Sequence, residues 1–171
     1  DSALAFVMEV MSNVESARAR FEAALAVLKQ HQTTDPEQTA AIGYCFGGSV
    51  VLSMANAGSD LDAVASFHGG LQGIIPAQQG VGSAKVLVCN GADDPMVTQE
   101  QIAAFKENMD AAGADYRFIN YEGALHSFTN PMADSFAAKF DMPLAYNKSA
   151  DEQSWQAMQE LFDSVFGGAK N

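Results

Sequence analysis

A cysteine flanked by glycines is the residue pattern with the clearest chemical meaning in this sequence. Residues 43–48 read Gly-Tyr-Cys-Phe-Gly-Gly, between a strand-like segment and a helical pattern. This is the nucleophile-elbow pattern with Cys in place of Ser, and side chains at its glycines are expected to collide with the strand and helix. The sulfur then lies at a helix N-terminus, which favours the thiolate. The pattern predicts a nucleophile at Cys45 and an oxyanion donor in the backbone N–H of Phe46.

The alternative for Cys45 is a small buried side chain packed between strand and helix, as is common for free cysteines. The glycines and the strand–turn–helix setting favour the nucleophile instead. Cys89 has neither feature, because it lies inside a strand pattern. We therefore predict that Cys89 is an inert core residue.

A thiol nucleophile needs a base, and the base needs a group that orients it. The loop at 91–95 offers two acids, and Asp94 fits the Gly-x-x-Asp-Pro form better than Asp93, which would cap or solvate the turn. His126 follows the last strand pattern, in agreement with the chain order nucleophile, acid, histidine. The sequence predicts a triad of Cys45, Asp94 and His126. The alternatives are ordinary turn acids and a loop histidine with structural hydrogen bonds.

His68 also follows a strand pattern, within Ser-Phe-His-Gly-Gly at 66–70. Chain order excludes it as the triad base, because it precedes the acid. We predict that it lines the substrate pocket, with a structural role as the open alternative. No Cys or His pair has the spacing of a zinc site, so no metal is predicted.

Four segments that position these residues have the composition of buried strands, and helical patterns alternate with them. The strand segments are 39–44, 62–67, 85–90 and 116–121. This alternation predicts an α/β fold with a parallel sheet and helices on both faces. Ligands bind beyond the carboxyl ends of such strands, which is where the candidate residues fall.

The helical patterns lie at 4–29, between Cys45 and Gly58, at 99–112 and at 151–166. The first is either two helices or one helix broken near Ser12, a candidate N-cap. Thr98 and Ser149 are the predicted caps of the last two. The final helix is expected to bury an apolar face made of Trp155, Met158, Leu161, Phe162 and Val165. Residues 123–143 are predicted to be mixed and irregular.

Composition narrows the class of protein. The chain has 171 residues, of which 48% are apolar, and this is the size of a single domain with a real core. No apolar run approaches the roughly 20 residues of a membrane helix. The formal net charge of −12 repels phosphate backbones and argues against nucleic acid as a partner. Two cysteines are too few for a disulfide framework, which favours a reducing, cytoplasmic compartment.

Several segments together resemble the dienelactone hydrolase family, over about residues 17–166. They are GYCFGG, FHGGL, GADDPMV, EGALHSF and the closing YNKSADEQSWQAMQELF. The resemblance implies an α/β-hydrolase fold and a small-molecule ester or lactone substrate, cleaved through an acyl-thioenzyme without a cofactor. It carries the family's triad onto Cys45, Asp94 and His126, and its first oxyanion donor onto the Phe46 backbone.

The chain departs from the family's pattern in two ways. Family members begin with several strands that have no counterpart here, so we expect an N-terminally truncated domain. The strand at 39–44 would then be an exposed sheet edge through which copies could associate. A family arginine that binds the substrate carboxylate falls on Asn130, which favours a broader ester, lactone or thioester specificity. The alternative functions are a truncated or catalytically incompetent hydrolase domain that serves as a binding or assembly module, and a cysteine peptidase.

Overall fold

The structure is a computed structural model that describes the backbone of residues 2–167 and the side chains of residues 5–10 and 12–167. The chain divides into two compact units, Asp1–Thr39 and Ala40–Asn171. The prediction that residues 1–171 form a single domain stays a prediction.

The first unit is a pair of helices, α1 (Ser2–Ser12) and α2 (Val14–Lys29). The predicted break near Ser12 is confirmed, but the predicted cap is wrong. Asn13 caps α2, because its side-chain oxygen accepts the Ser16 N–H at 3.0 Å. The Ser12 hydroxyl instead donates to a carbonyl of the preceding turn at 2.8 Å. Both are short polar residues, so their side-chain chemistry alone did not separate them.

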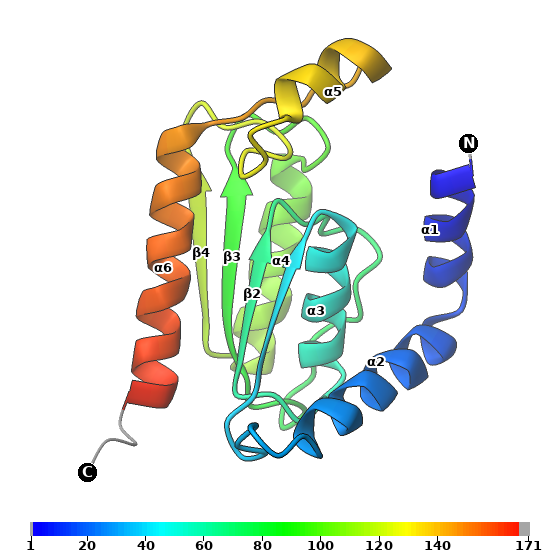
Figure 1. The fold of residues 1–171 in the computed structure, drawn as a ribbon, viewed down its shortest axis with the longest axis vertical. Helices are drawn as coiled ribbons and strands as arrows, with labels where there is room; N and C mark the ends of the chain where they lie inside the picture. The colour runs from blue at the N-terminus through cyan, green and yellow to red at the C-terminus, as the bar shows by residue number, and fades with distance from the viewer. Residues whose placement is uncertain (1, 168–171) are drawn as a thin grey trace. The chain divides into compact units, whose positions relative to one another are not determined.

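The second unit is built on a four-stranded parallel sheet with the strand order β1-β2-β3-β4 (Figure 1). The strands are β1 (Ala40–Tyr44), β2 (Ala63–Phe67), β3 (Lys85–Gly91) and β4 (Tyr116–Tyr121). Each predicted strand is confirmed to within a residue at either end. β2 is buried throughout and β3 nearly so, as expected of strands covered on both faces.

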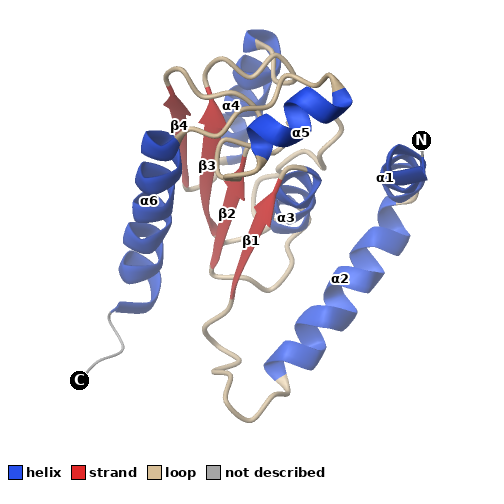
Figure 2. Cartoon of the chain, turned by 45° about the horizontal axis from the view of Figure 1, so that its top comes forward, coloured by secondary structure: helices blue, strands red, loops and turns tan. Residues whose placement is uncertain are grey.

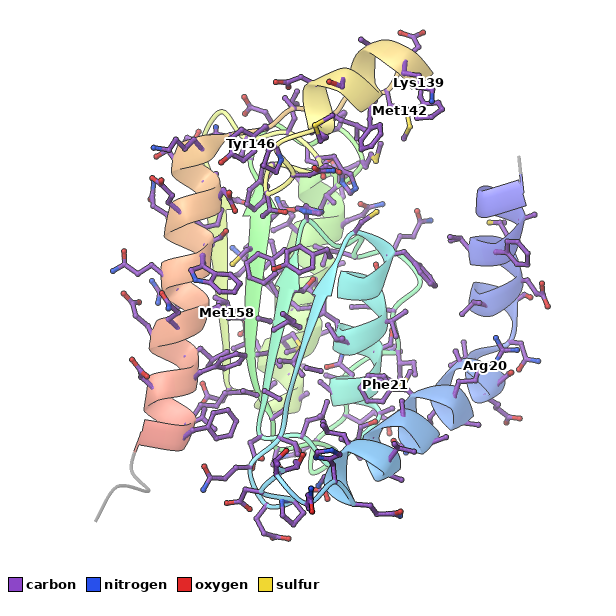
Figure 3. All side chains as sticks on the ribbon, in the orientation of Figure 1. Arg20, Phe21, Lys139, Met142, Tyr146 and Met158 are labelled. Atoms are coloured by element: carbon purple, nitrogen blue, oxygen red, sulfur yellow. The ribbon has the colours of Figure 1, made fainter. Side chains whose placement is uncertain are left out.

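Helices cover both faces of this sheet, as predicted (Figure 2). They are α3 (Phe46–Asn56) and α4 (Gln99–Ala112) on one face and α6 (Lys148–Phe166) on the other. Side chains alternate along a strand, so the register identifies the two faces. Phe67 and its partner Cys89 share a core cluster with Met158, which points from α6 toward the sheet (Figure 3). On the other face Phe118 lies against α4, with a ring-centroid distance of 5.9 Å to Phe105.

The final helix begins earlier than predicted, and its predicted apolar face is confirmed for Met158, Leu161 and Phe162 but not for Trp155. Asn147 is its cap, accepting the Ala150 N–H at 3.1 Å, so the assignment of Ser149 was wrong. The buried positions are Ala150, Ser154, Ala157 and Met158, while Trp155 is 48% exposed. Trp155 follows the buried Ser154 by one residue, about 100° around the helix, and this turns the indole away from the sheet.

A short helix, α5 (Ala133–Phe140), lies in the segment predicted to be irregular. Met132 occupies its N-cap position without a side-chain cap bond, so the sequence carries no capping signal there. Within residues 2–167, no helix combines the length and hydropathy needed to cross a membrane.

Candidate active site

The ends of three strands bring the candidate residues together at the carboxyl edge of the sheet. Cys45 follows β1, Asp94 lies in the loop after β3, and His126 lies in the loop after β4. His126 Nε2 is 3.2 Å from Cys45 Sγ, and His126 Nδ1 is 2.8 Å from Asp94 Oδ2. The three residues therefore form one hydrogen-bonded chain in the order thiol, imidazole, carboxylate.

The turn at Cys45 is as tight as its glycines suggest. Cys45 has φ 52° and ψ −123°, a conformation that few side chains adopt. A Cβ on Gly43 would lie 2.1 Å from the Gly47 carbonyl oxygen, and one on Gly48 would lie 2.5 Å from Ser66 Oγ. A Cβ on Gly47 would meet nothing within 4 Å. The expected collisions therefore concern Gly43 and Gly48, and the expectation was wrong for Gly47.

The surroundings of the two sulfurs differ sharply. Cys45 is exposed, and its hydrogen bond with His126 lowers the pKa of its thiol. Partial burial opposes this shift, while the charge of His126 and the backbone N–H of Phe46 add to it. Cys89 is buried, and burial raises its pKa to about 12. Of the two thiols, only Cys45 is in a setting that favours the thiolate.

His126 is held by groups that favour its charged form. Burial lowers its pKa, but hydrogen bonds to Asp94 and Cys45 outweigh burial and raise the pKa to about 9. Asp94 is itself buried, and its second oxygen accepts the Met96 N–H at 2.9 Å. Asp93, by contrast, is exposed. The arrangement therefore shifts both groups toward their charged forms, the Cys45 thiolate and the His126 imidazolium.

His68 lies directly behind the Cys45 backbone and is 3% exposed. Its Nδ1 accepts the Cys45 N–H at 3.2 Å, and its Nε2 is 2.9 Å from Thr129 Oγ1. Its ring centroid is 5.2 Å from that of His126. Burial and the charge of His126 lower the His68 pKa to about 4. Both ring nitrogens are bonded to protein, and the predicted pocket-lining role stays a prediction.

Asn90 is a buried residue that the sequence analysis missed. Its side-chain amide donates to Asn120 Oδ1 and to the Gly91 carbonyl, each at 2.9 Å. The Gly91 carbonyl also accepts the Asp94 N–H at 3.2 Å. Asn90 therefore ties β3 to β4 just before the loop that carries the acid. A polar residue at the end of an apolar strand pattern was the signal that could have identified it.

The side chain of Asn130 has a structural role, because its oxygen accepts the Met132 N–H at 2.9 Å just before α5.

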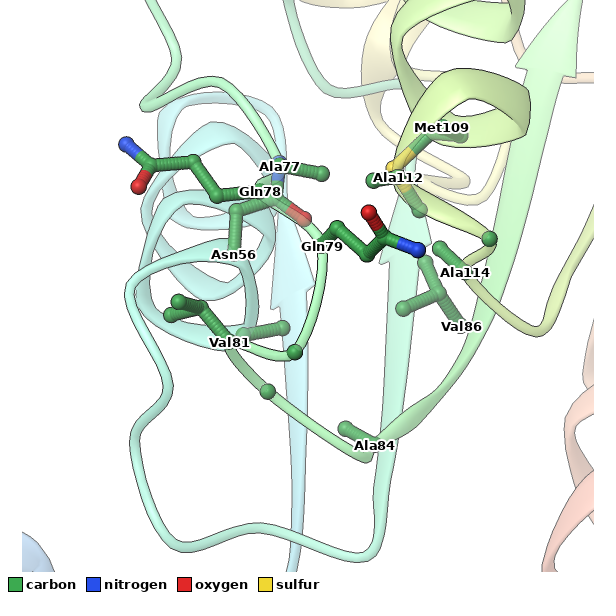
Figure 4. Close-up of a pocket in the computed structure, with 14 residues that line it drawn as sticks. Asn56, Ala77, Gln78, Gln79, Val81, Ala84, Val86, Met109, Ala112 and Ala114 are labelled. Atoms are coloured by element: carbon green, nitrogen blue, oxygen red, sulfur yellow. The ribbon is translucent and has the colours of Figure 1, made fainter.

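No cluster of three or more His, Cys, Asp or Glu side chains suited to a metal occurs in the described part of the chain. A pocket of about 370 Å³ lies between the C-terminal ends of α3 and α4 (Figure 4). It is lined by Asn56, Val86 and Met109 among others, at the end of the sheet opposite Cys45.

Comparisons with known proteins identify the family to which the chain is related. The model of the dienelactone hydrolase family matches residues 2–166. "Uncharacterized protein K02A2.1" of Caenorhabditis elegans is 34% identical over 152 residues, covering 87% of this chain and 94% of its own. A protein of Escherichia coli K12 named "Putative carboxymethylenebutenolidase" is 27% identical over 137 residues, covering 75% of this chain and 46% of its own.

A crystal structure is similar over nearly the whole chain. It is that of P91 from metagenomic libraries, described as a dienelactone hydrolase-like promiscuous phosphotriesterase, with 35% identity and a TM-score of 0.85. The match covers 94% of this chain and 66% of P91. The chain thus spans nearly all of the nematode protein, about two thirds of P91 and about half of the E. coli protein.

Proposed function

The chain belongs to the dienelactone hydrolase family, and from this premise we propose that it hydrolyses small carboxylic esters or lactones with Cys45 as nucleophile. The observation that carries the proposal is the hydrogen-bonded chain from Cys45 Sγ through His126 to Asp94. A thiol, a base and an orienting acid in this order are the parts that nucleophilic acyl transfer requires.

In the first half-reaction the Cys45 thiolate attacks the ester carbonyl carbon, and a C–S bond forms as the carbonyl oxygen becomes an oxyanion. The backbone N–H of Phe46, at the start of α3, is the proposed donor to that oxyanion. His126 gives its Nε2 proton to the leaving alkoxide as the C–O bond breaks. The product is an alcohol and a thioester on Cys45.

In the second half-reaction His126 accepts a proton from water, and the resulting hydroxide adds to the thioester carbonyl. Collapse of the intermediate breaks the C–S bond and releases the carboxylic acid. The thiolate and the imidazolium are thereby restored. Asp94 keeps Nδ1 of His126 in place at 2.8 Å and stabilises its positive charge throughout.

We expect the substrates to carry no carboxylate next to the acyl group that is transferred. Asn130 stands where the family resemblance places an arginine that binds a substrate carboxylate, and an amide offers no charge for that purpose. We therefore expect neutral aryl or alkyl esters, lactones and thioesters to react in preference to a substrate that carries a carboxylate beside the scissile bond.

The test combines turnover with trapping of the acyl-enzyme. Wild-type protein, Cys45→Ala and the matched Cys89→Ser variant are assayed with p-nitrophenyl acetate and analysed by intact mass after acid quenching. We expect turnover and an acetyl adduct in wild type and Cys89→Ser, and neither in Cys45→Ala. Wild-type turnover in Cys45→Ala would refute the assignment. Cleavage of peptides but not esters would favour a cysteine peptidase, and inertness toward both would favour a binding module.

Phosphotriester hydrolysis is a second candidate, favoured by the similarity to P91 and by the exposed thiol of Cys45. The thiolate would attack phosphorus and expel an aryloxide, and water would then cleave the S–P bond. Continued release of p-nitrophenol from an aryl dialkyl phosphate would support this activity. A single stoichiometric burst would show phosphorylation without turnover.

A further inference from the structure

Two residues with positive φ are in contact next to the sulfur of Cys45. Cys45 has φ 52° and His68 has φ 40°, and Ser127, with φ 61°, is next to His126. Three of the four non-glycine residues with positive φ in residues 2–167 thus lie at the site. Such conformations persist only where the surrounding contacts hold them, and they gather at functional sites.

A contact between these two residues holds the nucleophile's peptide group. The Cys45 N–H is shared between the Phe67 carbonyl at 3.0 Å and His68 Nδ1 at 3.2 Å. The second bond comes from a side chain on the neighbouring strand end, beyond the last β1–β2 pair. It therefore continues the attachment of β1 to β2 through the turn itself.

The bond also fixes the chemical form of His68. A backbone N–H can only donate, so Nδ1 must be an unprotonated acceptor. The remaining ring proton is then on Nε2, which lies 2.9 Å from Thr129 Oγ1 and donates to it. The imidazole is thus neutral, in agreement with the burial that lowers its pKa to about 4.

We propose that His68 is a positioning residue, which as a neutral Nε2–H imidazole holds the Cys45 backbone so that the sulfur meets His126. The ring is enclosed by Tyr44, Phe128 and His126 at centroid distances of 5.9, 5.3 and 5.2 Å. A protonated ring would lose the acceptor for the Cys45 N–H and would place a second cation beside His126. The inference deepens the proposed function, although the position of Cys45 can be tested without any ester.

The test compares His68→Phe with His68→Asn. Phenylalanine keeps an aromatic ring but has no acceptor. Asparagine offers a side-chain oxygen near the place of Nδ1, and it tolerates positive φ better than most residues. His31→Phe is the control, because His31 is exposed and belongs to the first unit. Circular dichroism and thermal melting establish that each variant is folded.

The first readout is the rate of Cys45 alkylation by iodoacetamide at pH 7, with Cys89 as the internal reference. The second is the separation of kcat from KM for p-nitrophenyl acetate. We expect His68→Phe to lower the alkylation rate and kcat by about tenfold or more with KM unchanged, because misplacement of a reacting group costs rate. His68→Asn should recover most of both rates, and His31→Phe should match wild type.

A folded His68→Phe variant with the wild-type alkylation rate would overturn the proposal, as would a His68→Asn variant as slow as His68→Phe. The wild-type protein with ¹⁵N-labelled histidine provides a test that needs no variant. Its NMR spectrum at pH 7 should show His68 protonated at Nε2 alone, and a proton on Nδ1 would overturn the proposal. If the wild type cleaves no ester, the proposed function fails, while alkylation and NMR still decide the role of His68.

Discussion

The thiol of Cys45 and the imidazole of His126 change each other's proton affinity in opposite directions. Their hydrogen bond lowers the pKa of Cys45 and, together with Asp94, helps to raise that of His126 to about 9. A thiol of ordinary pKa is only a few per cent thiolate at pH 7. At the residue scale, the proposed chemistry therefore rests on a hydrogen bond that favours transfer of the Cys45 proton to His126.

The pH dependence follows from these two directions. The Cys45 thiolate is lost as pH falls through its lowered pKa, and the His126 imidazolium is lost as pH rises through about 9. We expect kcat/KM for esters to be bell-shaped, with its alkaline limb near pH 9. In His126→Ala, alkylation of Cys45 by iodoacetamide at pH 7 should be about tenfold slower and its midpoint should move up toward an ordinary thiol. An unchanged alkylation profile in His126→Ala would contradict the ion pair.

Gly43 and Gly47 provide a matched pair of substitutions in the turn. In Gly43→Ala the new Cβ would lie 2.1 Å from a backbone oxygen, and in Gly47→Ala it would meet no atom within 4 Å. We expect Gly43→Ala to destabilise the protein by about 3 kcal/mol and to abolish ester turnover. Gly47→Ala should stay within about 1 kcal/mol of wild type, since alanine favours helices. Urea-unfolding midpoints compare the two, and equal losses would be inconsistent with the close approach of Gly43 to Gly47.

At the scale of elements, α6 supports the loop that carries His126 as well as the core. The Asn147 N–H donates to the Phe128 carbonyl at 3.0 Å, and the Asn147 amide donates to the Gly123 carbonyl at 3.2 Å. The backbone of Leu144 forms an isolated parallel β-bridge with that of His126. The segment before α6 thus runs beside the loop that carries His126, and the cap of the helix is hydrogen-bonded to that loop.

Substitution of Asn147 tests this double role. Asn147→Ala should cost about 1 kcal/mol through the lost cap and should also lower kcat. Asn147→Asp should recover the stability, because the carboxylate can still cap the helix, but not the bond to Gly123. Thr98→Ala is the control: it removes a capping box whose two bonds join Thr98 to Gln101 in the first turn of α4, and it should cost similar stability with kcat unchanged. Equal kcat in all of these variants would exclude a role for the α6 cap in the site.

At the scale of the whole molecule, the sequence predicts features that neighbouring residues determine. It does not predict contacts between residues that are far apart in the chain. The four strands were predictable because their apolar runs end at Gly-rich or polar turns. The hydrogen bonds of Asn90 and His68 were not, because their partners Asn120 and Thr129 are 30 and 61 residues away in the chain. The helix α5 was not predicted because Met132, at its N-cap, gives no capping signal. Cys45, Asp94 and His126 were identified by strand ends and chain order, and their catalytic roles stay proposals.

The strand β1 has one strand neighbour, β2, among residues 2–167. Tyr44 stacks on Phe67 at a centroid distance of 4.7 Å, so this part of β1 faces the same side as α6. Ile42 is two residues away and therefore points to that side as well. Ile42 is 44% exposed and Tyr44 is 40% exposed, which leaves apolar surface beside an unpaired strand edge. Such an edge is a template for association with another copy.

Self-association through this edge is the prediction that belongs to the whole molecule. Sedimentation velocity over a wide concentration range should show wild type moving from monomer to a larger species. Ile42→Lys should remain monomeric, because a charge on an exposed edge strand opposes pairing between copies while its site is outside the core. Trp155→Lys is the matched control, since it also replaces an exposed apolar residue, at 48%, but on α6. A wild type that is monomeric throughout would refute the prediction, and so would association that Trp155→Lys abolishes and Ile42→Lys leaves intact.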